Sequence, residues 1–157
     1  MISVHLKKLR KRVEVGPDEE RAIRNAVAET RHVPADETVV RSGEALNVSL
    51  MLLKGWMARS KDLSGGERQV TELHVAGDFA DLHGFTLKRL DHDVTTVTDC
   101  TLAVIPHERL QEITEKFPRL ARISCLPTSL WPTGFRRFWR IFRGVYVSVQ
   151  KNCFFRA

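Results

Sequence analysis

The fold of this chain is decided by residues 38–79, which read TVVRSGEALNVSLMLLKGWMARSKDLSGGERQVTELHVAGDF. The stretch alternates short apolar or β-branched runs with turns that contain glycine, which is typical of antiparallel strands. Gly43, Gly55 and Gly77 each follow such a run. Because glycine adopts positive φ without strain, these three positions predict tight structural turns.

Similar runs continue along the chain and together define a mainly β fold. Ser64-Gly65-Gly66-Glu67 stands between two of them and predicts a hairpin turn. Many short strands at this spacing indicate an antiparallel β-roll or jelly roll with flanking helices, an α+β arrangement. The segment 80–90 interrupts the series and reads as a helical turn plus loop. The predicted strands cover residues 38–41, 48–53, 56–61, 69–75, 94–98 and 101–105.

Helices are expected on both sides of the roll. Gly16-Pro17 followed by acidic residues predicts the start of a short amphipathic helix, which we expect to end near His32–Pro34. A second helix begins after Pro106, and Pro118 is expected to break it near Phe117. The chain therefore divides into an N-terminal helical segment (1–32), a β-roll (33–106), a C-terminal helix (107–123) and a tail (124–157).

Three glycine motifs in register resemble the cyclic-nucleotide-binding-type β-roll of Crp/Fnr transcription regulators. They are Gly43-Glu44, Lys54-Gly55 and Gly77-Asp78-Phe79, and the resemblance covers roughly residues 6–123. It implies a domain that senses a small-molecule effector and forms a homodimer. Family members continue into a long helix and a winged helix-turn-helix, a pattern that residues 124–157 do not match. We therefore expect the DNA-binding half to be missing or replaced, and DNA to be a partner only where a helix-turn-helix is present.

The resemblance also locates an effector pocket, where this sequence departs from the family. Members that bind cyclic AMP carry Gly-Glu-Leu after the Gly-Asp-Phe motif and an Arg-Ser pair later. The matching positions here read Asp81-Leu82-His83 and Leu90-Asp91, and a carboxylate at Asp81 or Asp91 would repel a phosphate. Arg89 lies one position from the expected arginine, so it either fills that role by a shift of register or lies on the surface, which we favour. We expect no cofactor and no cyclic nucleotide; the pocket candidates are Asp78, Asp81, Leu82, His83, Arg89, Leu90 and Asp91.

The histidines of this sequence raise the alternative of a metal site. His74, His83 and His92 are evenly spaced, and a cupin-like metal-dependent enzyme is the alternative that they raise, although no His-x-His pair occurs. We interpret them as surface or loop histidines and predict no metal site. Cys100 is expected to be a small buried hydrophobe. Because no nucleophile elbow, P-loop or dinucleotide fingerprint occurs, no enzymatic activity is expected.

The charge of the chain is concentrated at its end. The net charge is +6, and the tail from residue 124 holds six basic residues, no acidic ones and eight of the twelve aromatics. Such a tail suits a membrane interface, nonspecific nucleic-acid contact, or a fortuitous sequence read out of frame, the interpretation we favour. With no signal peptide, no transmembrane segment and an odd number of cysteines, the sequence predicts a cytoplasmic protein.

Overall fold

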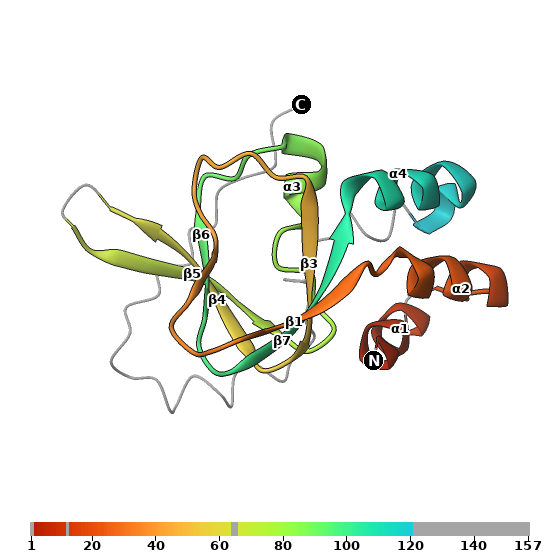
Figure 1. Cartoon of the computed structure of the whole chain (residues 1–157), viewed down its shortest axis with the longest axis horizontal. Coiled ribbons are helices and arrows are strands. Elements are labelled where there is room, and N and C mark those ends of the chain that lie inside the picture. Colours follow the sequence, from red (N-terminus) through yellow and green to blue (C-terminus); the bar gives the residue numbers. More distant parts are fainter. Residues whose placement is uncertain (1, 12, 64–65, 121–157) are drawn as a thin grey trace.

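The computed structural model describes residues 2–11, 13–63 and 66–120. Two antiparallel sheets form a roll, and helices lie against one side of it (Figure 1). The first sheet has the order β1-β7-β3 and the second has the order β2-β6-β4-β5. The strands are β1 (Glu29–Val33), β2 (Thr38–Val40), β3 (Val48–Lys54), β4 (Trp56–Asp62), β5 (Arg68–Val75), β6 (Asp93–Thr96) and β7 (Cys100–Pro106), and the helices are α1 (Ser3–Arg10), α2 (Pro17–Ala26), α3 (Leu82–Leu87) and α4 (His107–Lys116).

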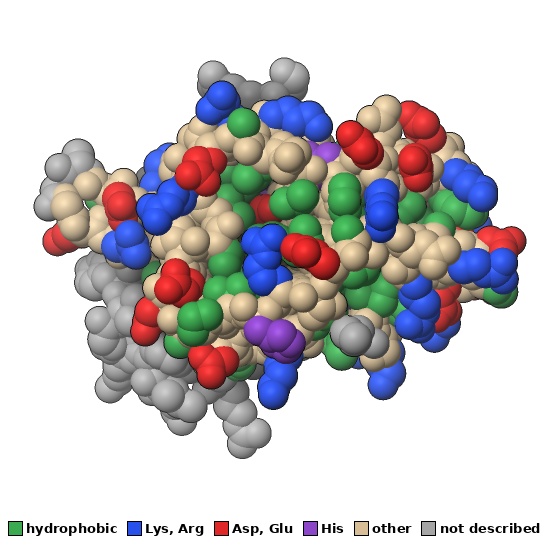
Figure 2. Space-filling view, viewed as in Figure 1, with side chains coloured by type: hydrophobic (Ala, Val, Ile, Leu, Met, Phe, Trp, Pro, Cys, Tyr) green, Lys and Arg blue, Asp and Glu red, His purple; other side chains and the backbone are tan. Residues whose placement is uncertain are grey.

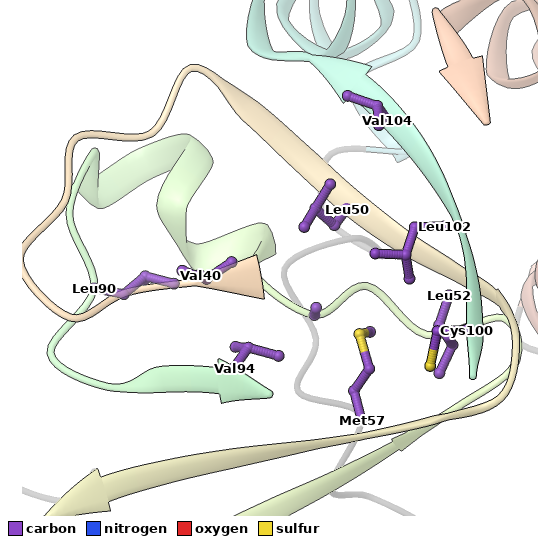
Figure 3. Packing of buried hydrophobic residues seen from close by; sticks show 10 residues of the cluster. Val40, Leu50, Leu52, Met57, Leu90, Val94, Cys100, Leu102 and Val104 are labelled. Atoms are coloured by element: carbon purple, nitrogen blue, oxygen red, sulfur yellow. The ribbon is translucent and has the colours of Figure 1, made fainter. Parts of the chain in front are cut away.

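The interior of the roll is an apolar cluster to which both sheets contribute (Figure 3). Strand β7 lies in the middle of its sheet, with both faces buried. Leu102 and Val104 point into the roll, whereas Ala103 and Ile105 point toward the helices. This alternation follows from the two-residue period of a strand, and it explains why β7 is apolar at consecutive positions.

The second apolar cluster joins the first sheet to α1, α2 and α4. Helix α2 begins at Pro17, and the Glu19 side chain closes its first turn by accepting a hydrogen bond from the Gly16 backbone N–H at 2.9 Å. Helix α4 begins at His107, directly after β7 ends at Pro106, so no loop separates the strand from the helix. Buried residues from this cluster include Ile2, Leu6, Leu9, Ile23, Met51 and Leu120.

The predicted fold class is confirmed, and so is the antiparallel β4–β5 hairpin, whose pairing runs out to Asp62 and Arg68. The expected end of the first helix is wrong, because α2 stops at Ala26 and Glu29–Val33 form β1, paired with β7. This strand is polar and largely exposed, so it lacks the apolar alternation that reveals a strand in a sequence. Helix α4 stops before Phe117 as Pro118 predicts. The tail 124–157 lies outside the described residues.

Candidate functional site

The three turn glycines all have positive φ, at 80° for Gly43, 97° for Gly55 and 90° for Gly77. Their surroundings differ. A Cβ on Gly55 would lie 2.5 Å from the Asp99 carbonyl oxygen, and one on Gly77 would lie 3.1 Å from the His5 backbone nitrogen. A Cβ on Gly43 would meet nothing within 4 Å. Gly55 and Gly77 are therefore required by space as well as by backbone conformation.

The segment that follows Gly77 adds to the open edge of β3 as a short extra strand. The Leu52 N–H donates to the Asp78 carbonyl at 2.8 Å, and the Ala80 N–H donates to the Leu50 carbonyl at 2.9 Å. The Asp81 side chain then takes the place of the next backbone carbonyl, because its Oδ1 accepts from the Leu50 N–H at 2.7 Å. Asp81 thus ends this ladder and positions the start of α3.

Burial of the Asp81 carboxyl changes its acidity. The residue is 2% exposed, and its Oδ2 has no hydrogen-bond partner among the described residues. Loss of hydration raises the pKa of Asp81 from 3.8 to about 7, against the smaller opposing effect of the Leu50 N–H. Near neutral pH the group therefore exists in both protonation states.

Asp78 connects the roll to the N-terminal helix. Its Oδ1 accepts from Lys8 Nζ at 2.8 Å, and its Oδ2 accepts from the Val75 N–H at 3.0 Å. His5 Nδ1 donates to the Gly77 carbonyl at 2.9 Å. Helix α1 is thereby held against the turn at residues 77–78 by two hydrogen bonds, from Lys8 and His5, as well as by its apolar face.

The remaining pocket candidates do not converge on one site. Leu90 is 4% exposed and belongs to the apolar interior, whereas His83 lies on the surface and Leu82 is half-buried at the first position of α3. Arg89 is exposed and donates to the Gly43 carbonyl, as expected of a surface position. Asp91 is exposed; its pKa is lowered by a hydrogen bond from Lys61 and, next, by one from His92.

A polar cluster inside the roll was missed from the sequence. Met57 belongs to the apolar interior and pairs with His74, and Arg59 pairs with Glu72 and with the interior residue Val94. Directly paired residues project to the same face of a sheet, so Arg59, Glu72 and His74 face inward. The sequence signal for this cluster is the two-residue period of a strand, which puts residues 57 and 59 of β4 on one face and residues 72 and 74 of β5 on one face.

We call Arg59, Glu72, His74 and His92 the roll cluster. Arg59 Nη1 lies 3.5 Å from Glu72 Oε2, and Arg59 Nε and both ring nitrogens of His74 have no hydrogen-bond partner among the described residues. Arg59 lies within electrostatic range of both histidines, whose pKa values are lowered chiefly by burial. A buried donor without a partner costs about 1–3 kcal/mol, so a group that satisfied these atoms would stabilise the fold.

The interpretation of the histidines as surface or loop residues is wrong for two of the three. His74 is 3% exposed and faces into the roll, and His92 is 4% exposed; His83 is exposed. No group of three or more His, Cys, Asp or Glu side chains in the described part of the chain could hold a metal ion. Cys100 is buried in the roll interior, as expected.

The helical side of the molecule has two hollows that involve the described residues. One, of about 230 Å³, lies between α2 and the end of α4, and is lined by Asp18, Arg21, Asn25 and Lys116. Figure 2 shows the mixed acidic and basic side chains over these helices. The other, of about 30 Å³, is mainly apolar, and His5, Phe79 and Leu110 are among the residues that line it.

Comparison with known proteins identifies the family to which this fold belongs. The model of the cyclic nucleotide-binding domain family matches residues 30–117, more than half of the chain. The chain belongs to the cyclic nucleotide-binding domain family. This match agrees with the cyclic-nucleotide-binding-type β-roll that the three glycine motifs predicted.

Similar proteins of this family are regulators. The chain is 25% identical over 101 residues to the transcriptional activator protein FnrA of Stutzerimonas stutzeri, covering 64% of this chain and 41% of that protein. It resembles the catabolite activator protein of Thermus thermophilus (TM-score 0.62, 15% identity, 68% of this chain and 50% of that one). It also resembles CLP, described as a c-di-GMP responsive global regulator, of Xanthomonas campestris (TM-score 0.60, 18% identity, 80% and 59%).

The chain spans about two fifths of the length of its curated relative and half or slightly more of these two regulators. It covers 83% of the N-terminal domain of a Streptomyces coelicolor transcriptional regulator, with a TM-score of 0.59 and 12% identity. The shared part is therefore the domain built around the roll. Among the described residues, no helix is long and apolar enough to cross a membrane.

Proposed function

We propose that this chain is the signal-sensing and dimerisation domain of a Crp/Fnr-like transcriptional regulator, in which the roll responds to an effector and performs no chemistry. The family match over residues 30–117 is the observation that carries the proposal. The roll cluster supports it, because buried polar groups without partners are unusual in a purely structural core. Neither the separate pocket candidates nor the two hollows assemble a nucleophile with a base.

The proposed effector is not a cyclic nucleotide. A bound phosphate needs backbone N–H donors and a nearby cation. At the positions that carry the family's Gly-Glu-Leu and Arg-Ser, this chain has a buried carboxyl at Asp81 and an apolar interior residue at Leu90. Arg89 is turned outward to the Gly43 carbonyl. A phosphate would therefore meet a buried carboxyl at Asp81 and no cation at position 90, where the family carries its arginine.

The proposed output is a shift of the helices that pack on the roll. Helix α4 continues directly from β7, and both α4 and α1 pack on the outer face of the first sheet. The roll cluster lies on the second sheet, whose Met57 packs in the same apolar interior as Leu102 of β7. A ligand that moved this interior would therefore act on the helices through the first sheet. The Crp/Fnr regulators that the chain resembles read DNA with a winged helix-turn-helix, and the segment 124–157 lacks the sequence pattern for one.

A thermal-shift screen of the purified chain against a library of small metabolites tests the sensing role. We expect at least one compound to raise Tm saturably and to alter amide hydrogen exchange in both β4–β5 and α4. If no compound raises Tm, or if binding leaves exchange in α4 unchanged, the sensing role is wrong.

Two further measurements test the dimer and the absence of DNA reading. Light scattering is expected to give twice the chain mass of 18.0 kDa. A gel shift at physiological salt is expected to give only complexes that random DNA competes away. A monomer, or a complex with one DNA sequence that resists this competition, would contradict the corresponding part of the proposal.

A further inference from the structure

The roll cluster has the composition of a binding site for an anion with one charge. Arg59 supplies a positive charge, Glu72 a negative one, and His74 and His92 are uncharged while burial keeps their pKa values low. The cluster is therefore close to neutral, although three of its buried polar atoms have no hydrogen-bond partner among the described residues. An added acceptor group would be held by Arg59 Nε and by a His74 nitrogen.

The contact between Arg59 and Glu72 is weak enough to be exchanged. Nη1 and Oε2 lie 3.5 Å apart, beyond the usual range for a charge-assisted hydrogen bond, and the two side chains are 28% and 25% exposed. A carboxylate arriving from solvent could take the place of the Glu72 carboxylate on the guanidinium. Glu72 would then act as a competitor built into the site.

The surroundings limit what the anion can be. Met57 and Val94 lie on the same inner face and belong to the apolar interior, so they suit an apolar body attached to the charged group. A phosphate dianion beside Glu72 would place two additional negative charges against a single guanidinium. A monocarboxylate adds a single negative charge, and one proton taken up by a histidine balances that charge.

We propose that the roll cluster is the effector-recognition site and that it takes a small organic monocarboxylate, held by Arg59 and His74 in competition with Glu72. This inference rests on the proposed sensing function and names the ligand class for it.

Binding at this site is coupled to a proton. The charged and titratable groups that act on His74 are Arg59 from β4, Glu72 from β5, Asp78 from the following turn and Lys8 from α1. Burial lowers the pKa of His74, and a bound carboxylate would raise it by stabilising the imidazolium. Binding therefore takes up a proton, and affinity falls as the pH rises, by at most about tenfold per pH unit for one proton.

Titration calorimetry on the full chain tests the ligand class with acetate, butyrate and benzoate at pH 6 and pH 8. Butyramide is the uncharged control for butyrate, and inorganic phosphate and cyclic AMP are the alternative anions. We expect at least one carboxylate to bind saturably and more tightly at pH 6, and butyramide and phosphate not to bind.

Substitutions assign the binding to the roll cluster. Arg59→Met is expected to weaken carboxylate binding by more than tenfold, and Glu72→Gln to strengthen it several-fold because the competitor loses its charge. Arg68→Met is the matched control, since Arg68 is an exposed arginine of the same hairpin that pairs with Asp62. His74→Leu is expected to remove the pH dependence, and circular dichroism checks that each variant is folded.

The outcomes separate this inference from the sensing function. If no carboxylate binds, or if Arg59→Met binds as tightly as the unaltered chain, the ligand class is wrong. Saturable binding of cyclic AMP without carboxylate binding would also overturn it, and would leave the roll a sensor. A metabolite of another class that alters exchange in α4 would likewise support sensing while rejecting the monocarboxylate.

Discussion

Lys8 of α1 donates a 2.8 Å hydrogen bond to Asp78, which lies 70 residues away in the sequence and is 5% exposed. The pair joins the N-terminal helix to the turn that follows β5. The same carboxylate accepts from the Val75 N–H, so one side chain fixes both the turn and the helix. Since Asp78 is also within electrostatic range of His74, this contact lies between the roll interior and the helical layer.

Replacing Asp78 by Ala is expected to lower the free energy of unfolding by about 2–3 kcal/mol, because the Val75 N–H and the Lys8 ammonium both lose their acceptor. Lys8→Met should cost less, about 1 kcal/mol, because Lys8 is partly exposed and water can replace it as a donor. Urea unfolding followed by circular dichroism measures both. Lys7→Met, an exposed position on the same helix, is the control; equal stability of the two lysine variants would contradict the role of the pair.

The turn glycines are expected to differ in how much alanine costs. Gly43→Ala should lower the free energy of unfolding by about 1–2 kcal/mol, because only the left-handed backbone conformation is strained. Gly55→Ala should cost more than either of the others, since its Cβ would lie 2.5 Å from a backbone carbonyl oxygen. Gly77→Ala should fall between them, because α1 can shift. Urea midpoints of the three variants give the order, and a Gly43 variant as unstable as the Gly55 variant would contradict it.

Much of this fold could be predicted because its strands carry local signals. The six predicted strands are present with ends shifted by a few residues, since apolar alternation and glycine turns are properties of the local sequence. Strand β1 was missed because its residues are polar and exposed and only its pairing with β7 makes it a strand. Helix α1 falls within the predicted N-terminal helical segment but was not identified as a separate helix, since its buried Leu6 and Leu9 are separated by basic residues.

The candidate site was harder to predict, because it depends on which face of a strand each residue occupies. The pocket candidates were taken from the segment 78–91 because the family's motif lies there. In the structure these residues lie at separate places: in the roll interior, on the surface and against β3. The inward direction of Arg59 and His74 follows from the pairing of Met57 with His74 and of Arg59 with Val94. Such pairings join distant strands, and the sequence alone does not specify them.

The roll interior should tolerate truncation far less than α3. Leu102 is fully buried in the central strand, so Leu102→Ala should lower the free energy of unfolding by about 2–5 kcal/mol through lost contacts and a cavity. Leu87, on α3, is 66% exposed, and Leu87→Ala should change stability by less than about 0.5 kcal/mol. Thermal unfolding of both variants measures the difference. A large loss for Leu87→Ala would mean that α3 is covered by another surface in solution.

Asp81 makes stability depend on pH in a direction opposite to that of an ordinary paired carboxylate. Its pKa is about 7 in the folded chain and near 3.8 when unfolded, so between these values the folded state binds more protons. The contribution of Asp81 to the free energy of unfolding is therefore complete below about pH 4 and is lost as the pH rises to about 7, by up to about 4 kcal/mol in total.

Asp81→Asn removes this titration while keeping an oxygen that can accept from the Leu50 N–H. Urea unfolding at pH 5 and pH 8 should show the variant losing less stability than the unaltered chain over this interval. His74 and His92, whose pKa values are lowered, favour the opposite trend below about pH 6.5, but they are present in both proteins, so their effects cancel in the difference. Parallel pH profiles for the two proteins would mean that the carboxyl at position 81 is hydrated in solution and titrates normally.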